Sequence, residues 1–266
     1  MSQTGHGAVI VTGAAGRRSI GRACAVELLS LGRPVVIVDI APLDVDGGVD
    51  TAESGQRSTR EILETALKTG QLTVCTGSVS DPGVAQQAVR SVLQQHGQLA
   101  GLVNMAGIVA PTTFLEISRA ELERIFAVNV TGTLLMCQAA LPVMVEGRNG
   151  SVVNVSSVAA LTGGDVFGGT HYAASKAAVE AMTRGIAREF TPKGVRCNAV
   201  APGYVDTDLV SGRLSADQRD QILTRSLVRR AGQPSEVAKT VSFLLSDAAS
   251  NITGTVLDVN GGMYFR

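Results

Sequence analysis

The chain has 266 residues, of which 45% are hydrophobic and only 3% aromatic, with no tryptophan, and its 23 basic residues balance 23 acidic ones. This length suits one large α/β domain that covers residues 1–266, and a neutral balance without a basic cluster excludes a protein that binds nucleic acid along its backbone. A core of Ala, Val, Leu and Ile is typical of a parallel sheet that helices bury on both faces.

The cysteines and histidines are scattered along the chain, so their spacing suggests neither a disulfide frame nor a metal site. We expect reduced cysteines in the core and no bound metal. The first residues hold no apolar signal segment, and no apolar run reaches the ~18 residues of a membrane span. We therefore expect a cytoplasmic protein with no membrane partner.

The first motif is an apolar run at residues 8–11, a turn that begins at Gly13, and a helical pattern at 22–31. A strand, a glycine-rich turn and a helix form a cradle for the phosphates of a dinucleotide, because the helix start offers unpaired N–H groups. Gly13 permits the tight turn, Ser19 stands at the expected N-cap, and Gly21 lets helix and strand pack closely. An ordinary glycine-rich turn is the alternative interpretation.

The second strand, at residues 35–39, ends in a carboxylate. An acid about 20 residues beyond the glycine turn can accept hydrogen bonds from an adenosine ribose and would repel a 2′-phosphate, so Asp39 favours NAD over NADP. Arg17 and Arg18 argue the other way, because a guanidinium in the turn can pair with a 2′-phosphate. Their alternative is an exposed loop surface, and we expect Asp39 to decide for NAD.

The rest of the chain alternates strands with helices. Residues 41–56 form a polar loop whose aspartates lack the glutamate of a calcium site, so we interpret it as a surface insertion. This alternation predicts a doubly wound parallel sheet of seven strands, with its ligand crevice outside the carboxyl ends of the strands. The five remaining strands are expected at residues 72–75, 102–104, 151–155, 194–200 and 255–259.

Two polar features stand out on the predicted helices. A capping box at 118–121 starts a long helix with Leu122 and Ile125 on its buried stripe, and Asn129 lies inside that apolar stretch. A buried amide must be hydrogen-bonded, so Asn129 either satisfies the helix locally or points at a ligand. Tyr172 and Lys176 lie one turn apart on a later helix, where an ammonium beside a phenol favours the phenolate and permits proton exchange with a hydroxyl or carbonyl.

Taken together, these segments resemble the short-chain dehydrogenase/reductase family in its single-domain form. The similarity runs from Val9 to Gly262, with the motifs in the family's order: Thr12-Gly13, Asn104-Met105-Ala106-Gly107, Asn129, Asn154-Val155-Ser156-Ser157, Tyr172 with Lys176, and Pro202-Gly203 followed by Thr207. The resemblance implies a Rossmann-type fold and an NAD(H)-dependent oxidoreductase that acts on CH–OH groups. Its small-molecule partner would be a secondary alcohol or ketone.

The resemblance also implies a role for each catalytic residue. Tyr172 would be the general acid and base, and Ser157, rather than Ser156, would hold the substrate oxygen beside the phenol. Lys176 would lower the pKa of Tyr172 and bind the nicotinamide ribose. Asn129 would hold a water that links Lys176 to solvent.

Other motif residues would bind the dinucleotide, and members of the family commonly form tetramers. We therefore expect a homotetramer or homodimer through the helices at 118–146 and 171–190. The residues expected to bind the cofactor are Gly13, Ser19, Ile20, Gly21, Asp39, Ser78, Val79, Asn104, Ala106, Gly107, Tyr172, Lys176, Pro202, Gly203, Val205 and Thr207.

The chain also departs from the family pattern. Its glycine turn has two extra residues, and Ser19 replaces the middle glycine, a form that resembles the related enoyl-acyl-carrier-protein reductases. Those enzymes space tyrosine and lysine more widely than Tyr172 and Lys176, so we reject C=C reduction. Ser78 stands where an aspartate usually meets adenine.

The substrate pocket is expected between residues 108–114, 158–171 and a mobile excursion at 204–227, with His171 on the surface at its helix start. Two alternative functions stay open. One is an NADP(H)-dependent ketone reductase, and the other is a catalytically silent regulatory protein that binds a dinucleotide.

Overall fold

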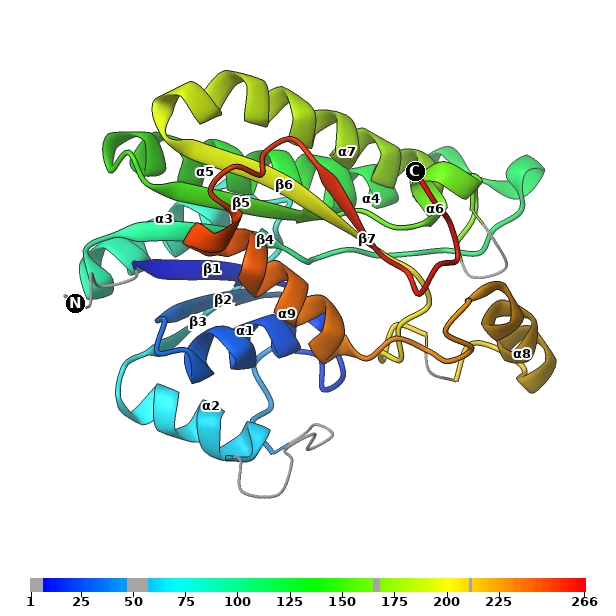
Figure 1. Cartoon of the computed structure of the whole chain (residues 1–266), viewed down its shortest axis with the longest axis horizontal. Helices are drawn as coiled ribbons and strands as arrows, with labels where there is room; N and C mark the ends of the chain where they lie inside the picture. The colour runs from blue at the N-terminus through cyan, green and yellow to red at the C-terminus, as the bar shows by residue number, and fades with distance from the viewer. Residues whose placement is uncertain (1–6, 47–56, 165–167, 211) are drawn as a thin grey trace.

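The computed structural model describes residues 7–46, 57–164, 168–210 and 212–266, and it shows a central parallel sheet between two helical layers (Figure 1). The order β3-β2-β1-β4-β5-β6-β7 reverses direction at β1, which opens a crevice between the ends of β1 and β4. The predicted doubly wound sheet of seven strands is therefore confirmed. The strands are β1 (Ala8–Thr12), β2 (Val35–Asp39), β3 (Leu72–Thr76), β4 (Leu99–Asn104), β5 (Gly150–Val155), β6 (Val195–Pro202) and β7 (Val256–Val259).

Alternate residues of each central strand bury themselves under opposite helical layers. In β1, Val9 and Val11 join one apolar cluster and Ala8 and Ile10 join the other, all fully buried. The first cluster lies under α1 (Ile20–Ser30), α2 (Thr59–Lys68) and α9 (Pro234–Leu245). The second lies under α3 (Pro82–His96), α5 (Thr133–Glu146) and α7 (Thr170–Phe190). This is the aliphatic, two-sided core that the composition predicts.

The long helix expected from residue 118 is interrupted. It consists of α4 (Arg119–Phe126), a π-helical turn η2 (Ala127–Gly132) and α5. Ile125 is fully buried as expected, but Leu122 is 39% exposed, so the predicted buried stripe is wrong at that position. By length and mean hydropathy the stretch Arg119–Glu146 resembles a membrane span, and in this fold α5 packs against α3, β4 and α7 as a core helix.

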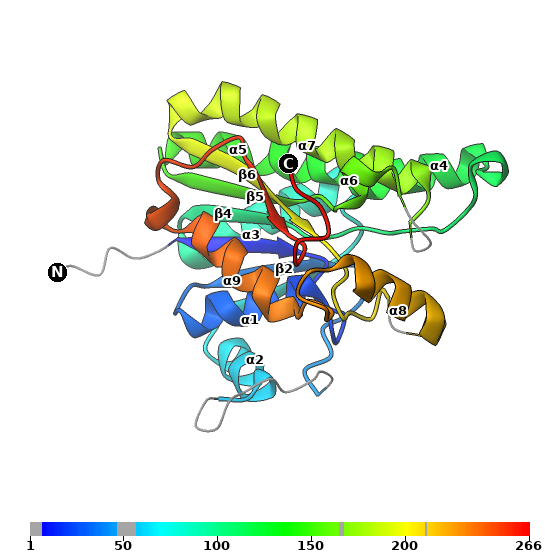
Figure 2. The same ribbon diagram turned by 45° about the vertical axis from the view of Figure 1, so that its right-hand side comes forward.

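The excursion at 204–227 contains the helix α8 (Ala216–Arg225), which begins at a capping box on Ser215. In both views α8 lies beyond the carboxyl ends of the strands (Figure 2). The remaining elements are short: η1 (Phe114–Glu116), α6 (Ala159–Thr162), η3 (Thr191–Lys193) and η4 (Asp247–Ala249).

The four cysteines are free and buried, as expected. Of the loop at 41–56, residues 47–56 lie outside the described residues, and so do the first six residues of the chain and Asp165. Within the described part of the chain, no group of three or more His, Cys, Asp or Glu side chains could hold a metal ion.

Candidate active site

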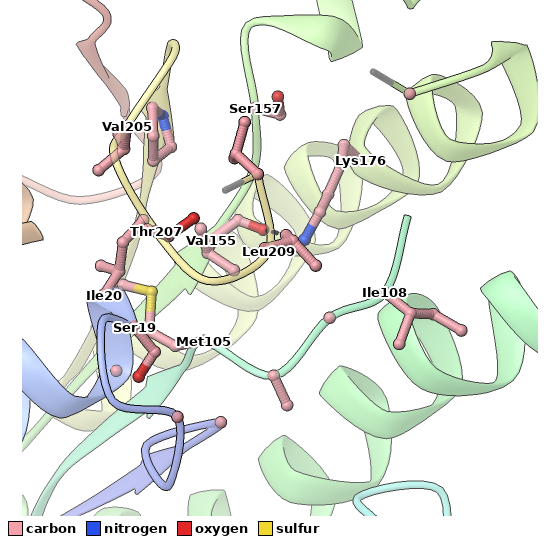
Figure 3. A pocket seen from close by; sticks show the side chains of 18 of the residues that line it. Ser19, Ile20, Met105, Ile108, Val155, Ser157, Lys176, Val205, Thr207 and Leu209 are labelled. Carbon is pink, nitrogen blue, oxygen red and sulfur yellow. Dashed lines mark hydrogen bonds between the residues drawn. The ribbon is translucent and has the colours of Figure 1, made fainter. Parts of the chain in front are cut away.

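A cavity of about 510 Å³ opens at the carboxyl ends of the strands (Figure 3). It is bordered by residues that end or follow strands β1 to β7, from Gly13 after β1 to Met263 after β7. This is where a parallel open sheet places its ligand, and the volume lies within the range of about 300–1,000 Å³ that is usual for small-molecule sites.

The glycine turn forms a tight cradle at one end of this cavity. Gly13 has a φ of +67°, and a Cβ on it would lie 2.7 Å from the Cα of Ala106. A Cβ on Gly21 would overlap the carbonyl oxygen of Gly13. The Ser19 hydroxyl accepts a hydrogen bond from the Arg22 N–H at 3.0 Å, which makes it the predicted N-cap. The start of α1 therefore faces the cavity closely enough to hold a pyrophosphate with backbone N–H groups.

Asp39 borders the cavity at the end of β2. Its carboxylate accepts hydrogen bonds from the backbone N–H of Ala15 at 2.8 Å and of Ala41 at 3.2 Å. Each oxygen keeps a second lone pair, so the carboxylate can also accept the hydroxyls of a ribose. Ile40 next to it is 76% exposed and offers an apolar surface for a flat ring, a feature that the sequence analysis missed.

The two arginines of the turn are held by carboxylates. Arg17 lies 2.6 Å from Asp44, measured from Nη2 to Oδ2. The Arg18 Nε lies 3.2 Å from Oδ1 of Asp208, and its backbone N–H donates to Oδ2 of the same residue at 2.8 Å. Each guanidinium is therefore partly neutralised by a carboxylate, which weakens its attraction for a phosphate.

Tyr172 and Lys176 project from the first two turns of α7 into the same cavity. The Lys176 Nζ donates to the carbonyl oxygen of Val155 at 3.0 Å and lies 5.8 Å from the centre of the Tyr172 ring. Only 3% of Lys176 is exposed, and this burial lowers the pKa of its ammonium from 10.5 to about 8. The lysine is poised to gain or lose a proton in mildly alkaline solution.

The two serines after β5 differ in their surroundings. The buried Ser156 donates its hydroxyl to Oε1 of Glu180 at 2.8 Å. Ser157 accepts from the backbone N–H of Ala159 at 3.1 Å, a contact that leaves its hydroxyl proton for another acceptor. Figure 3 shows Ser157 beside the cavity with Lys176 nearby. The geometry favours Ser157 over Ser156 as a group that can bind a substrate oxygen.

Asn129 lies on the π-helical turn η2 and is fully buried. Its side chain accepts from the N–H of Ile108 at 2.9 Å and donates to the carbonyl oxygen of Ile108 at 3.0 Å and to Ser175 at 3.0 Å. It stands behind Gly107, where a Cβ would lie 3.3 Å from Asn129 Oδ1 and 3.4 Å from Lys176 Nζ. The turn thus brings Asn129 next to the lysine, and π-helical turns are common at functional sites. Its role in holding a water stays a prediction.

Of the residues predicted to bind the cofactor, Asn104 is the exception, because it does not border the cavity. It pairs in register with Asn154 of β5, and its Nδ2 donates to Asn154 Oδ1 at 2.8 Å and to Cys137 Sγ of α5 at 3.4 Å. Its side chain thus has a structural partner, and its expected contact with the cofactor stays a prediction. The others border the cavity together: Gly13, Ser19, Ile20, Gly21, Asp39, Ser78, Val79, Ala106, Gly107, Tyr172, Lys176, Pro202, Gly203, Val205 and Thr207.

His171 is buried rather than on the surface, with only 3% of it exposed. Its Nε2 lies 2.9 Å from Oε1 of Glu121, which also accepts the hydroxyl of Thr112 at 2.6 Å. This cluster links α4 to the start of α7 directly beside Tyr172. This cluster could not be predicted from a local pattern, because its members lie 9 to 59 residues apart along the chain.

Comparison with known proteins agrees with this site. A family model described as enoyl-(acyl carrier protein) reductase matches residues 13–264. A protein from Sinorhizobium fredii, an uncharacterized short-chain type dehydrogenase/reductase, is 37% identical over 254 residues, which cover 96% of each chain. The 3-oxoacyl-[acyl-carrier-protein] reductase FabG of Thermotoga maritima is 34% identical over 254 residues, again 96% of each chain.

Solved structures lead to the same family. The crystal structure of gox2181 has a TM-score of 0.83 and 31% identity, and it covers 97% of this chain and 95% of its own. A short-chain glucose/ribitol dehydrogenase from Brucella melitensis has a TM-score of 0.81 and 31% identity, covering 98% of both chains. The chain belongs to the short-chain dehydrogenase/reductase family of oxidoreductases, which bind a nicotinamide dinucleotide.

Proposed function

We propose that this protein is an NAD(H)-dependent dehydrogenase or reductase that transfers hydride between a secondary alcohol or ketone and nicotinamide. One observation carries the proposal: Ser157, Tyr172 and Lys176 border the same cavity as the glycine turn and Asp39. Tyr172 and Lys176 are also expected to contact the dinucleotide, but a site that only bound a dinucleotide would have no need to place Ser157 together with both of them.

The proposed mechanism divides the work between the dinucleotide, which supplies or accepts the hydride when bound, and four side chains of this chain. Ser157 donates a hydrogen bond to the carbonyl oxygen and holds it beside the phenol. Tyr172 gives that oxygen a proton during reduction and takes it back during oxidation. The Lys176 ammonium favours the phenolate and, through a water beside Asn129, exchanges its proton with solvent.

Two features near the glycine turn, the carboxylate of Asp39 at the end of β2 and the ion pairs of the arginines, support NAD rather than NADP. Asp39 would accept the ribose hydroxyls and repel a 2′-phosphate. Arg17 and Arg18, the groups that would attract such a phosphate, are already paired with Asp44 and Asp208. An NADP(H)-dependent enzyme would have to hold a phosphate next to a carboxylate, with both arginines already partly neutralised.

The names of several relatives favour a second candidate within the same chemistry, the reduction of a 3-oxoacyl thioester. The ketone of such a substrate would meet the same serine and tyrosine. Apolar side chains that border the cavity, among them Ile108, Leu209, Ile222 and Met263, would accept an acyl chain. C=C reduction, which the matching family model names, is less favoured because Tyr172 and Lys176 are four residues apart and Ser157 stands with them.

The test begins with fluorescence titrations of NADH and NADPH into purified protein. Tighter binding of NADH is expected, and tighter binding of NADPH would contradict the assignment of Asp39.

Turnover is then measured with acetoacetyl-CoA and with a panel of secondary alcohols and ketones. Tyr172→Phe should abolish turnover while NADH binding survives, and full turnover in that variant would refute the mechanism. Tight binding without turnover on any substrate would favour the silent regulatory protein.

We further propose a cytoplasmic homotetramer or homodimer. Supporting this assembly, Leu122 and Leu134 are 39% and 41% exposed on the helical stretch that the family commonly uses for association. Light scattering at several protein concentrations would measure the mass of the assembly, and a single chain mass throughout would contradict the proposal.

A further inference from the structure

The glycine turn is tied to a segment that lies far away in the sequence. Arg18, one of the residues of the lengthened turn, contacts Asp208 through its backbone and its side chain, and the Arg18 Nη1 lies 3.6 Å from Asp206 Oδ1. The Asp208 N–H donates in return to the Arg18 carbonyl oxygen at 3.2 Å. We name these contacts the Arg18 bridge. They join residues that are 190 positions apart.

The two sides of the bridge face each other across the mouth of the cavity. Gly16 and Ser19 border it from the turn, and residues 205 and 207–210 border it from the segment that follows β6. In Figure 3 this segment, with Val205, Thr207 and Leu209, passes beside Ser19 and Ile20. Its other end is fixed by backbone hydrogen bonds to Gly232, which accepts from Asp206 and donates to Tyr204, both at 2.9 Å. The bridge therefore ties the 204–210 segment to the glycine turn at the end of the cavity that Gly16 and Ser19 border.

The Arg18 bridge brings two negative charges next to the glycine turn. Asp206 and Asp208 place two carboxylates beside the cradle for an anionic pyrophosphate, and Asp208 itself borders the cavity. Carboxylates at this place weaken the binding of an anion, so their presence indicates a different role. Both contact the guanidinium of Arg18, whose side chain is only 30% exposed.

We infer that Arg18 is a positioning residue that fastens the 204–210 segment to the glycine turn and so slows release of the bound dinucleotide. The inference rests on dinucleotide binding at this site, as proposed above, and is independent of the substrate. Arg18 acts through the segment and not by contact with a phosphate. With the bridge broken, the segment can swing away from Ser19 and leave the cradle open.

The decisive variant is Asp208→Ala, because the bridge and simple electrostatics predict opposite results for it. If Asp208 fastens the segment, its loss speeds release of the dinucleotide. If Asp208 is only a negative charge near the pyrophosphate, its loss slows release and tightens binding. Arg18→Ala speeds release in either case, so it serves as the partner in a double-mutant cycle.

Release is measured by stopped-flow fluorescence. The protein is first loaded with NADH or NADPH, whichever the wild type binds more tightly, and is then mixed with an excess of oxidised dinucleotide. We expect about threefold to fivefold faster release from Arg18→Ala and from Asp208→Ala, the size of effect usual for an exposed ion pair with a backbone hydrogen bond. The double variant should release no faster than the faster single variant. Arg17→Ala is the matched control, because it removes the same charge from the same turn while its partner Asp44 lies outside the 204–210 segment, and it should speed release less than Arg18→Ala does.

Slower release from Asp208→Ala, or rates in the double variant that simply multiply, would overturn the bridge. Unchanged release from both single variants would overturn it as well. In these three cases the wild type still binds dinucleotide and the proposed function stands. Failure of the wild type to bind either dinucleotide would overturn the proposed function itself, and the bridge with it.

Discussion

Replacing Lys176 by methionine should make the dinucleotide-free protein more stable near neutral pH while it abolishes catalysis. The lysine is 3% exposed, its ammonium has a single hydrogen bond to Val155, and the described residues bring no carboxylate to it. A buried charge with so little compensation opposes folding. Methionine has a similar unbranched shape and no charge, so it can fill the same space.

The pKa of the lysine sets the size of the effect. Burial lowers this pKa from 10.5 to about 8. At 1.36 kcal/mol for each pH unit, this difference corresponds to about 3 kcal/mol of unfavourable free energy for the charged form in the folded protein. Methionine also removes the hydrogen bond to Val155, which is worth about 1 kcal/mol. The net gain at pH 7 is therefore about 2 kcal/mol.

The pH dependence of the stability difference between wild type and Lys176→Met is a second test of whether the lysine is buried as a charge. Below pH 8 the lysine is charged in both the folded and the unfolded chain, so the full penalty is present. Between pH 8 and pH 10.5 the unfolded chain binds more protons than the folded one, so the stability of the wild type rises with pH relative to the variant. Above pH 10.5 the penalty is gone and the variant is the less stable protein, by about the 1 kcal/mol of the lost hydrogen bond.

The assay is urea unfolding of wild type and Lys176→Met at one protein concentration, at pH 7, 9 and 10.5, without dinucleotide. Taking the difference between the two proteins cancels the titration of all other groups. A variant that is less stable than the wild type at pH 7, with a difference that does not change with pH, would show that the lysine is not buried as a charge and would refute the reasoning.

Three further predictions follow from the same site. Asp39→Asn should bind NADPH about tenfold better relative to NADH, as measured by fluorescence titration, because the repelling charge is gone. Ser157→Ala should lower kcat by about 10²-fold or more because the substrate oxygen loses its hydrogen bond, whereas Ser156→Ala should keep most of the activity. Gly21→Ala should lose dinucleotide binding by calorimetry, since its Cβ would overlap the Gly13 carbonyl oxygen, while the melting temperature reports whether the fold survives.

Much of the fold could be predicted because buried parallel strands are short apolar runs that end in turns. β2 occupies the predicted residues 35–39, since all its core positions are Val or Ile. β4 begins at Leu99, three residues before its predicted start, because Ala100 and Gly101 carry little apolar signal although both are buried. The site residues on strand ends and on the first turns of α7 were predictable for the same reason, since topology alone brings strand ends together.

The remaining errors share one cause, which is that pairing between distant residues leaves no local pattern. Asn104 ends a predicted strand, and only the structure shows that its amide pairs with Asn154 under α5 and does not line the cavity. The position of His171 at the start of a helix predicts an exposed side chain, and only its contact with Glu121 from α4 explains its burial. The π-helical turn around Asn129 could not be predicted from the sequence either, because a helix with one wider turn has almost the same apolar spacing as a regular one.

The same distant pairing bears on the choice of dinucleotide. From the sequence, Asp39 and the two arginines of the turn are competing signals, one against a 2′-phosphate and two in favour of it. In the structure the arginines are partly neutralised by Asp44 and Asp208, which lie 27 and 190 residues from their partners. Removing the charge of Asp39 alone should therefore weaken the preference for NAD and not reverse it, because neither guanidinium is released. Freeing Arg18 from Asp208 as well should shift the preference further toward NADP, at the expense of the contact that fastens the 204–210 segment to the glycine turn.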